Sequence, residues 1–205
     1  MGGIRWWAAI VAMVLFGAAC GGSDDDVVES GDVAEAAVDD SASEEGDTDA
    51  ATPAPDCDAT SGLFTTADGA TTLNPTSALA ARILEGQAYT IYLADRPLAA
   101  DEVSFINAPA AGAGETIVTV ALTTFNAEEP PLPVVAGEVV EYTPDFGVRT
   151  FVVTADIAGE LLGNSTDASG TLTVTEVDGR FCAVVSYEDA EKSIEVVIDA
   201  EIVDI

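Results

Sequence analysis

The chain has 205 residues, of which 37 are acidic, six are basic and none is histidine. The net charge of −31 repels the phosphate backbones of nucleic acids, so we expect no nucleic-acid partner. Without histidine, Ser-His-Asp and Cys-His catalytic arrangements are excluded, and zinc loses its commonest protein ligand. We assign no metal ligand and no cofactor.

The chain begins with a short apolar segment. Arg5 precedes an apolar run over residues 6–19, which ends in three small residues directly before Cys20. Its 14 residues are fewer than the roughly 20 that a membrane-spanning helix needs. A basic residue, a short apolar run and small residues before a cut are typical of a removable signal. We predict that residues 1–19 are a signal peptide.

Gly17-Ala18-Ala19-Cys20 resembles the end of a bacterial lipoprotein signal, in which the cysteine is lipidated and becomes the new N-terminus. The resemblance covers only about the first 20 residues, and Gly17 stands where that family usually has Leu, Val or Ile. It implies palmitate-type acyl chains on Cys20 that anchor the protein to the outer side of the cell membrane. The alternative is a freely secreted protein, because these small residues also suit ordinary signal peptidase.

Residues 21–56 contain 13 Asp and Glu, with no basic and no aromatic residue. Such a composition cannot bury enough apolar surface to offset the entropy of ordering the backbone. We interpret residues 20–56 as the lipidated cysteine and a disordered acidic linker that serves as a stalk. The alternative is a binding tail for calcium or a basic partner, although acidic runs such as residues 24–26 lack the ligand spacing of an EF-hand loop.

Residues 57–205 have the length of a single domain, and their hydrophobic pattern is mostly that of β-strands. Residues 77–85 fit either a short helix or a strand, whereas residues 126–133, with three prolines, are expected to form a loop. We predict an all-β fold, an antiparallel β-sandwich or barrel of about eight short strands. Five strands are expected before the C-terminal part: 87–94, 102–107, 115–125, 138–142 and 148–157.

The C-terminal part is expected to form a three-stranded meander. Its first two strands, 171–177 and 180–187, flank Asp178-Gly179, a pair suited to a two-residue type I′ turn. That turn sets the register, which pairs Val174 with Ala183 and Leu172 with Val185. The third strand, 194–203, follows a turn at residues 188–191 and alternates so that one face is apolar: Ile194, Val196, Ile198, Ala200 and Ile202.

Cys57 and Cys182 remain once Cys20 is lipidated. Outside the membrane two thiols usually oxidise to one disulfide, so we predict a bridge that closes a loop of about 125 residues. Chain entropy gives such a bridge about 5 kcal/mol of stability. The alternative, a redox-active pair, lacks the Cys-x-x-Cys spacing.

No catalytic constellation stands out, and we expect a lipid-anchored, extracytoplasmic module that works in binding or envelope structure without catalysis. One alternative is a hydrolase of extracellular polymer, built on a carboxylate pair from candidates such as Asp95, Glu102, Glu138, Glu141 and Glu188. A second alternative is a calcium-dependent binding module. The candidate ligand-binding residues are Tyr89, Tyr92 and Arg96, which could line a groove for a cationic or other extracellular ligand.

Overall fold

The structure is a computed structural model that describes residues 57–104, 107–124, 131–145, 147–165 and 167–205. The predictions for the signal peptide, Cys20 and the acidic linker lie outside these residues. The described residues form eleven strands and two single-turn 3₁₀ helices: β1 (Ser61–Thr66), β2 (Thr72–Leu73), β3 (Ser77–Ile83), η1 (Leu84–Gly86), β4 (Ala88–Ala94), η2 (Ala100–Glu102), β5 (Thr116–Thr124), β6 (Val139–Glu141), β7 (Arg149–Ile157), β8 (Glu160–Leu162), β9 (Ser169–Glu176), β10 (Arg180–Glu188) and β11 (Lys192–Asp204). No helix among them has the length and apolar character to cross a membrane.

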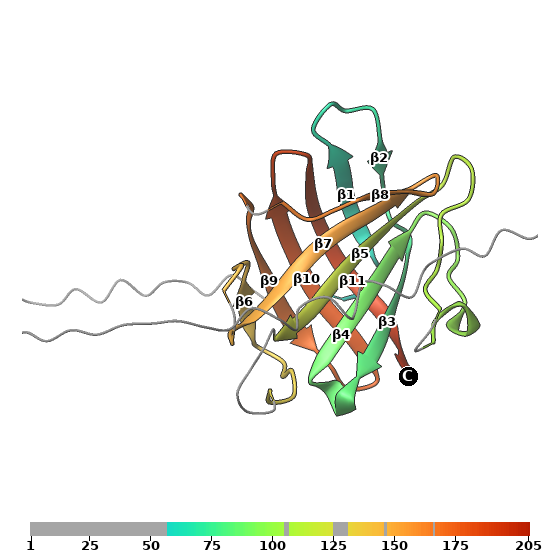
Figure 1. Cartoon of the computed structure of the whole chain (residues 1–205). Helices are drawn as coiled ribbons and strands as arrows, with labels where there is room; N and C mark the ends of the chain where they lie inside the picture. Colours follow the sequence, from blue (N-terminus) through green and yellow to red (C-terminus); the bar gives the residue numbers. More distant parts are fainter. Residues whose placement is uncertain (1–56, 105–106, 125–130, 146, 166) are drawn as a thin grey trace, which may run out of the picture. The chain divides into compact units, whose positions relative to one another are not determined.

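All eleven strands belong to one sheet, which curls into a half-barrel (Figure 1). Its order is β6-β9-β10-β11-β3-β4-β5-β7-β8, with β1 paired to β11 and to β2. The all-β class is therefore confirmed. The sheet is mixed rather than purely antiparallel, because β3 runs parallel to the last residues of β11. These two strands come from distant parts of the chain, so no hairpin forces them to run in opposite directions.

Most of the expected strands are present, and the ambiguous segment 77–85 forms strand β3 followed by η1. The strand predicted at 102–107 is wrong, because Glu102 ends η2 and no described residue of that segment is in a strand. Val103 is buried there, but it covers the sheet from a loop. Three strands were not predicted, namely β1, β2 and β8.

The C-terminal meander of β9, β10 and β11 is confirmed, with Val174 opposite Ala183 and Leu172 opposite Val185. The type I′ turn is wrong. It needs positive φ at both central residues, whereas only Gly179 has one, at 80°. Closer to the turn, the register between β9 and β10 shifts between Cys182 and Ala183. This irregularity accommodates one residue more than a strict two-residue loop allows.

The concave face of the sheet encloses the main core, to which β11 contributes Ile194, Val196, Ile198 and Ala200, each at most 2% exposed. The predicted alternation of this strand is thereby confirmed for these residues. A second, smaller core covers the opposite face of β3, β4 and β5. Those strands are buried on both faces, which explains why residues 78–81 form an unbroken apolar run without alternation.

The edge of β11 changes neighbour along its length, from β1 on its first half to β3 on its last residues. Thr60 lies where the neighbour changes. Its Oγ1 donates to Asp199 O at 2.9 Å and accepts from Asp199 N at 3.0 Å. On this edge of β11, neither β1 nor β3 pairs with Asp199. The side chain of Thr60 thus satisfies the backbone N–H and C=O groups of Asp199 by itself.

Strand β1 can approach β11 closely because it contains Gly62. This glycine has φ +140°, and a Cβ built on it would lie 2.1 Å from Glu195 O. We expect Gly62→Ala to lower the free energy of unfolding by about 1–3 kcal/mol, since β1 must move away from β11. Urea unfolding measures this loss. Gly114→Ala is the matched control, because Gly114 also has positive φ but open space around its Cβ position; equal losses in both variants would contradict the steric explanation.

Candidate functional site

The structure does not bring the candidate ligand residues Tyr89, Tyr92 and Arg96 together. Tyr89 and Tyr92 are three positions apart on β4 and face opposite sides of the sheet. Tyr89 packs in the main core, with its ring centroid 4.7 Å from that of Phe181. Tyr92 lies in the smaller core, and burial raises the pKa of both tyrosines. Arg96 forms an ion pair with Glu102 at 2.8 Å.

Two of the five candidate catalytic acids are neutralised by arginine. Glu102 accepts two hydrogen bonds from Arg96, which lower its pKa, and Glu138 pairs with Arg149 at 2.7 Å. A general acid in glycoside hydrolysis needs a raised pKa. The described carboxyl groups whose pKa is displaced are all displaced downwards: Asp68, Glu102, Asp189 and Asp204. Within the described ranges, no three Asp, Glu or Cys side chains are placed to hold a metal ion.

The most unusual polar group of the described fold is a fully buried ion pair at the turn between β10 and β11. Lys192 Nζ lies 2.6 Å from Asp189 Oδ2, and both side chains are 0% exposed. Nζ also donates to Gly163 O at 2.5 Å and lies 5.5 Å from the centroid of the Tyr187 ring. A buried charge needs this density of partners, since each ion loses its hydration on folding.

Hydrogen bonds extend from this pair across the opening of the half-barrel. Tyr187 Oη lies 2.7 Å from both Asp189 Oδ2 and Asn164 Oδ1, and Asn164 Nδ2 donates to Tyr142 Oη at 2.9 Å. Tyr142 follows β6 and Asn164 follows β8, the two end strands of the sheet order. The network therefore connects the two ends of the sheet. We call Tyr142, Asn164, Tyr187, Asp189 and Lys192 the closing cluster.

The protonation states in the closing cluster follow from these contacts. Burial by itself would raise the pKa of Asp189, but hydrogen bonds from Lys192, Tyr187 and two backbone N–H groups outweigh it and lower the pKa to about 2. Burial, followed by the hydrogen bond to Asp189, raises the pKa of Tyr187 above its ordinary value. Tyr187 therefore stays protonated beside a charged carboxylate.

The closing cluster was not predicted, although the sequence contains one signal for it. Lys192 stands two positions before Ile194, in phase with the buried residues of β11. A lysine in phase with buried positions requires an acidic partner nearby, and Asp189 is three residues away. The contributions of Gly163 and Asn164 depend on the path of the chain after β8, which local pattern does not show.

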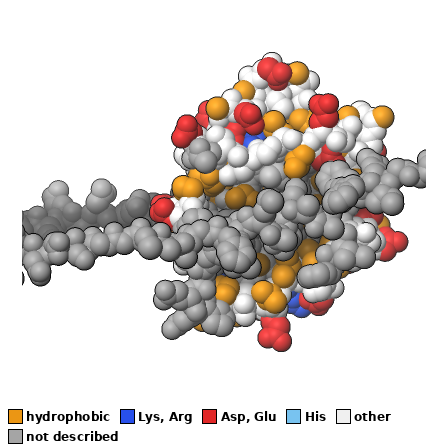
Figure 2. All heavy atoms as spheres, viewed as in Figure 1, with side chains coloured by type: hydrophobic (Ala, Val, Ile, Leu, Met, Phe, Trp, Pro, Cys, Tyr) orange, Lys and Arg blue, Asp and Glu red, His pale blue; other side chains and the backbone are white. Residues whose placement is uncertain are grey.

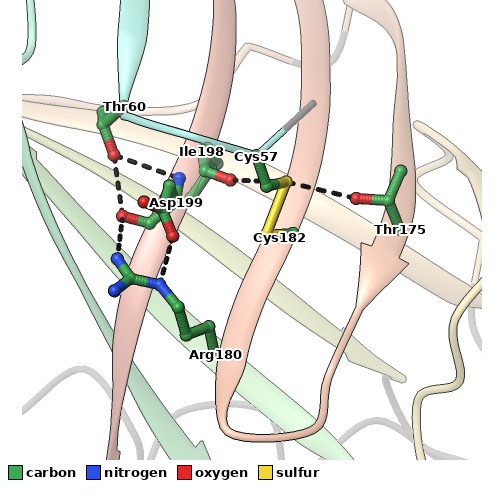
Figure 3. Close-up of a disulfide and its surroundings, with 7 residues drawn as sticks. All are labelled: Cys57, Thr60, Thr175, Arg180, Cys182, Ile198 and Asp199. Carbon is green, nitrogen blue, oxygen red and sulfur yellow. Dashed lines mark hydrogen bonds and ion pairs between the residues drawn. A yellow bond between two sulfur atoms is a disulfide. The ribbon is translucent and has the colours of Figure 1, made fainter. Parts of the chain in front are cut away.

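The predicted disulfide between Cys57 and Cys182 is present, with the two Cα atoms 6.0 Å apart (Figure 3). Cys182 lies on β10 between inward-facing Phe181 and Ala183, so its side chain points to the convex face. Its bond to Cys57 fixes the start of the described chain against that face. Cys57 Sγ also lies 3.4 Å from Thr175 Oγ1 on β9. The bridge thus holds the start of the described chain over β9 and β10.

A cleft of about 470 Å³ lies near the closing cluster, between the β1–β2 hairpin and the β7–β8 hairpin. Both hairpins are at the upper end of the half-barrel in Figure 1. The backbone of Ala67 donates to Glu191 O at 2.7 Å, which joins the β1–β2 hairpin to the β10–β11 turn. Ten residues line the cleft: Thr66, Ala67, Asp68, Ala70, Thr71, Ile157, Glu160, Leu161, Leu162 and Glu191.

No family model, no curated protein and no solved structure matches this chain.

Proposed function

We propose that the protein is a lipid-anchored extracytoplasmic lipoprotein whose folded part serves as a non-catalytic binding or envelope-structural module. The observation that carries this proposal is the Cys57–Cys182 disulfide. Disulfides persist in oxidising compartments outside the cytoplasm, which is where a lipoprotein signal ending at Cys20 would deliver the chain. With the other two cysteines paired, Cys20 is the cysteine left for lipid.

The non-catalytic part of the proposal is supported by the side chains that could do chemistry. The chain has no histidine, and Glu102 and Glu138 are held by arginines. Among the described residues, the most deeply buried charged groups are Lys192 and Asp189, which neutralise one another and are not exposed to a substrate. Such arrangements stabilise a fold and its surface; they do not supply a general acid.

The anchor is tested by metabolic labelling with an alkyne-tagged palmitate, followed by fractionation of the cells. We expect the full chain to carry label and to sediment with membranes, and Cys20→Ala to lose the label and appear in the soluble extracellular fraction. The matched control is Cys57→Ala/Cys182→Ala, which removes two cysteines and is expected to keep the label. The proposal of a lipid anchor would be contradicted by an unmodified N-terminal cysteine on the mature protein, or by label that persists in Cys20→Ala.

A further inference from the structure

The cleft between the β1–β2 and β7–β8 hairpins has apolar and acidic lining residues but no basic one. Its apolar part includes Ile157, Leu161 and Leu162, and Leu161 is 55% exposed. An exposed leucine beside a cleft gives up its hydration readily to a bound apolar group. The acidic part consists of Asp68, Glu160 and Glu191.

The carboxylates of the cleft have no cation of the described structure to neutralise them. Each of the five basic side chains among the described residues is already paired with other acids: Arg82 with Asp204, Arg96 with Glu102 and Glu115, Arg149 with Glu138, Arg180 with Asp199, and Lys192 with Asp189. Basic side chains are also sparse on the face shown in Figure 2, where acidic side chains lie around the margin. A cation that enters the cleft therefore meets a negative field without a competing internal partner.

The geometry favours an organic cation over a metal ion. Calcium needs several oxygen ligands that converge on one point, and Asp68, Glu160 and Glu191 do not form such a group. Asp68 is also engaged locally, since its Oδ1 accepts hydrogen bonds from Ala70 N at 2.9 Å and Thr66 Oγ1 at 2.7 Å. An ammonium group needs only proximity to the carboxylates, and its apolar part can lie on Leu161 and Leu162.

We propose that this cleft binds a small amphipathic organic cation, an ammonium group attached to an apolar body. The proposal gives a ligand class to the binding role proposed above, and it is independent of the lipid anchor. Because the carboxylates are solvent-accessible, the attraction is screened within about 8 Å at physiological salt, so affinity falls as salt is added.

The test uses the full chain with Cys20→Ala, exported without lipid, and three probes of equal length: hexylammonium, hexanol and hexanoate. Binding is measured by NMR titration, and the backbone amides of Thr71, Leu161 and Leu162 report the location. We expect hexylammonium to bind at least about tenfold more tightly than hexanol, and hexanoate not to shift these amides.

Two variants test whether the charge of the cleft, rather than its shape, determines binding. Glu160→Gln/Glu191→Gln is expected to weaken hexylammonium binding about tenfold without changing hexanol binding. Asp178→Asn, in the β9–β10 turn at the other end of β10, is the matched control and is expected to bind like the parent chain. Equal binding of hexylammonium and hexanol, unchanged binding in the double variant, or displacement of hexylammonium by stoichiometric calcium would overturn the proposal. The two experiments are independent: a negative hexylammonium titration would not change the palmitate-labelling result, and an absence of label would not change the titration.

Discussion

Replacement of Lys192 by methionine is expected to lower the free energy of unfolding by about 3–5 kcal/mol. Methionine keeps the length of the side chain and its apolar contacts but removes the charge. Asp189, which is 0% exposed, then stays buried without its cation. Gly163 O also loses the donor that lies 2.5 Å away. The loss is large because an uncompensated buried charge costs far more than the net value of the pair.

A double-mutant cycle distinguishes this explanation from a loss of packing. Asp189→Asn keeps an oxygen that can accept from the backbone N–H groups of Glu191 and Lys192, now held at 2.8 and 2.9 Å. In Lys192→Met/Asp189→Asn no charge is left buried, so we expect the double variant to be more stable than the sum of the single losses predicts. Additive losses in urea unfolding would show that the charges are not coupled.

The surface pair Arg82–Asp204 is the matched control. Its geometry is also close, at 2.6 Å, but its side chains are 36% and 72% exposed. Arg82→Met is therefore expected to lower the free energy of unfolding by less than about 1 kcal/mol. A loss similar to that of Lys192→Met would mean that burial is not the cause.

Because of the same ion pair, the free energy of unfolding depends on pH in the acidic range. The pKa of Asp189 is lowered from 3.8 to about 2 in the folded protein, so its stabilising effect is complete well above 3.8 and is lost as the pH falls from 3.8 towards 2. We expect the parent chain to lose more stability over this interval than Asp189→Asn does. Unfolding by urea at a series of pH values measures the difference.

The C-terminal meander was predictable because its information is local. Alternating apolar residues set the inner face of β11, and Asp178-Gly179 located the hairpin well enough to give the correct pairing of Val174 with Ala183. The details of the turn were not predictable, since the shift between Cys182 and Ala183 occurs only in the pairing of β10 with β9, and the alternation of apolar residues does not reveal it.

The errors elsewhere have one physical source, which is packing between distant segments. Val103 has the apolar character of a strand residue, but it belongs to a loop that covers the outer face of β3–β5. Strand β1 contains Gly62 and only one buried residue, Phe64, so its sequence has no strong β pattern. The segment forms a strand because it pairs with β11. In the same way, the closing cluster exists because the segments after β6 and β8 meet at the β10–β11 turn.

Removal of the disulfide, in Cys57→Ala/Cys182→Ala, is expected to lower the free energy of unfolding by about 2–5 kcal/mol. The bridge joins residues 125 positions apart, so the unfolded chain without it gains the freedom of almost the whole described sequence. In the folded state the first described residues keep the two hydrogen bonds between Thr60 and Asp199, at 2.9 and 3.0 Å. We therefore expect the domain still to fold, with the change arising mainly from the unfolded state.

Two comparisons test that origin of the effect. Reduction of the parent chain by dithiothreitol should lower its stability to that of the double variant and leave the double variant unchanged, as measured by urea unfolding. The slope of the free energy against urea should also rise when the bridge is absent, because a chain without the cross-link exposes more surface on unfolding. Cys20→Ala is the matched control and is expected to leave the stability of residues 57–205 as it is, since Cys20 lies outside the cross-linked loop. If the reduced parent chain were as stable as the oxidised one, the constraint that the bridge places on the unfolded chain would not be a source of stability.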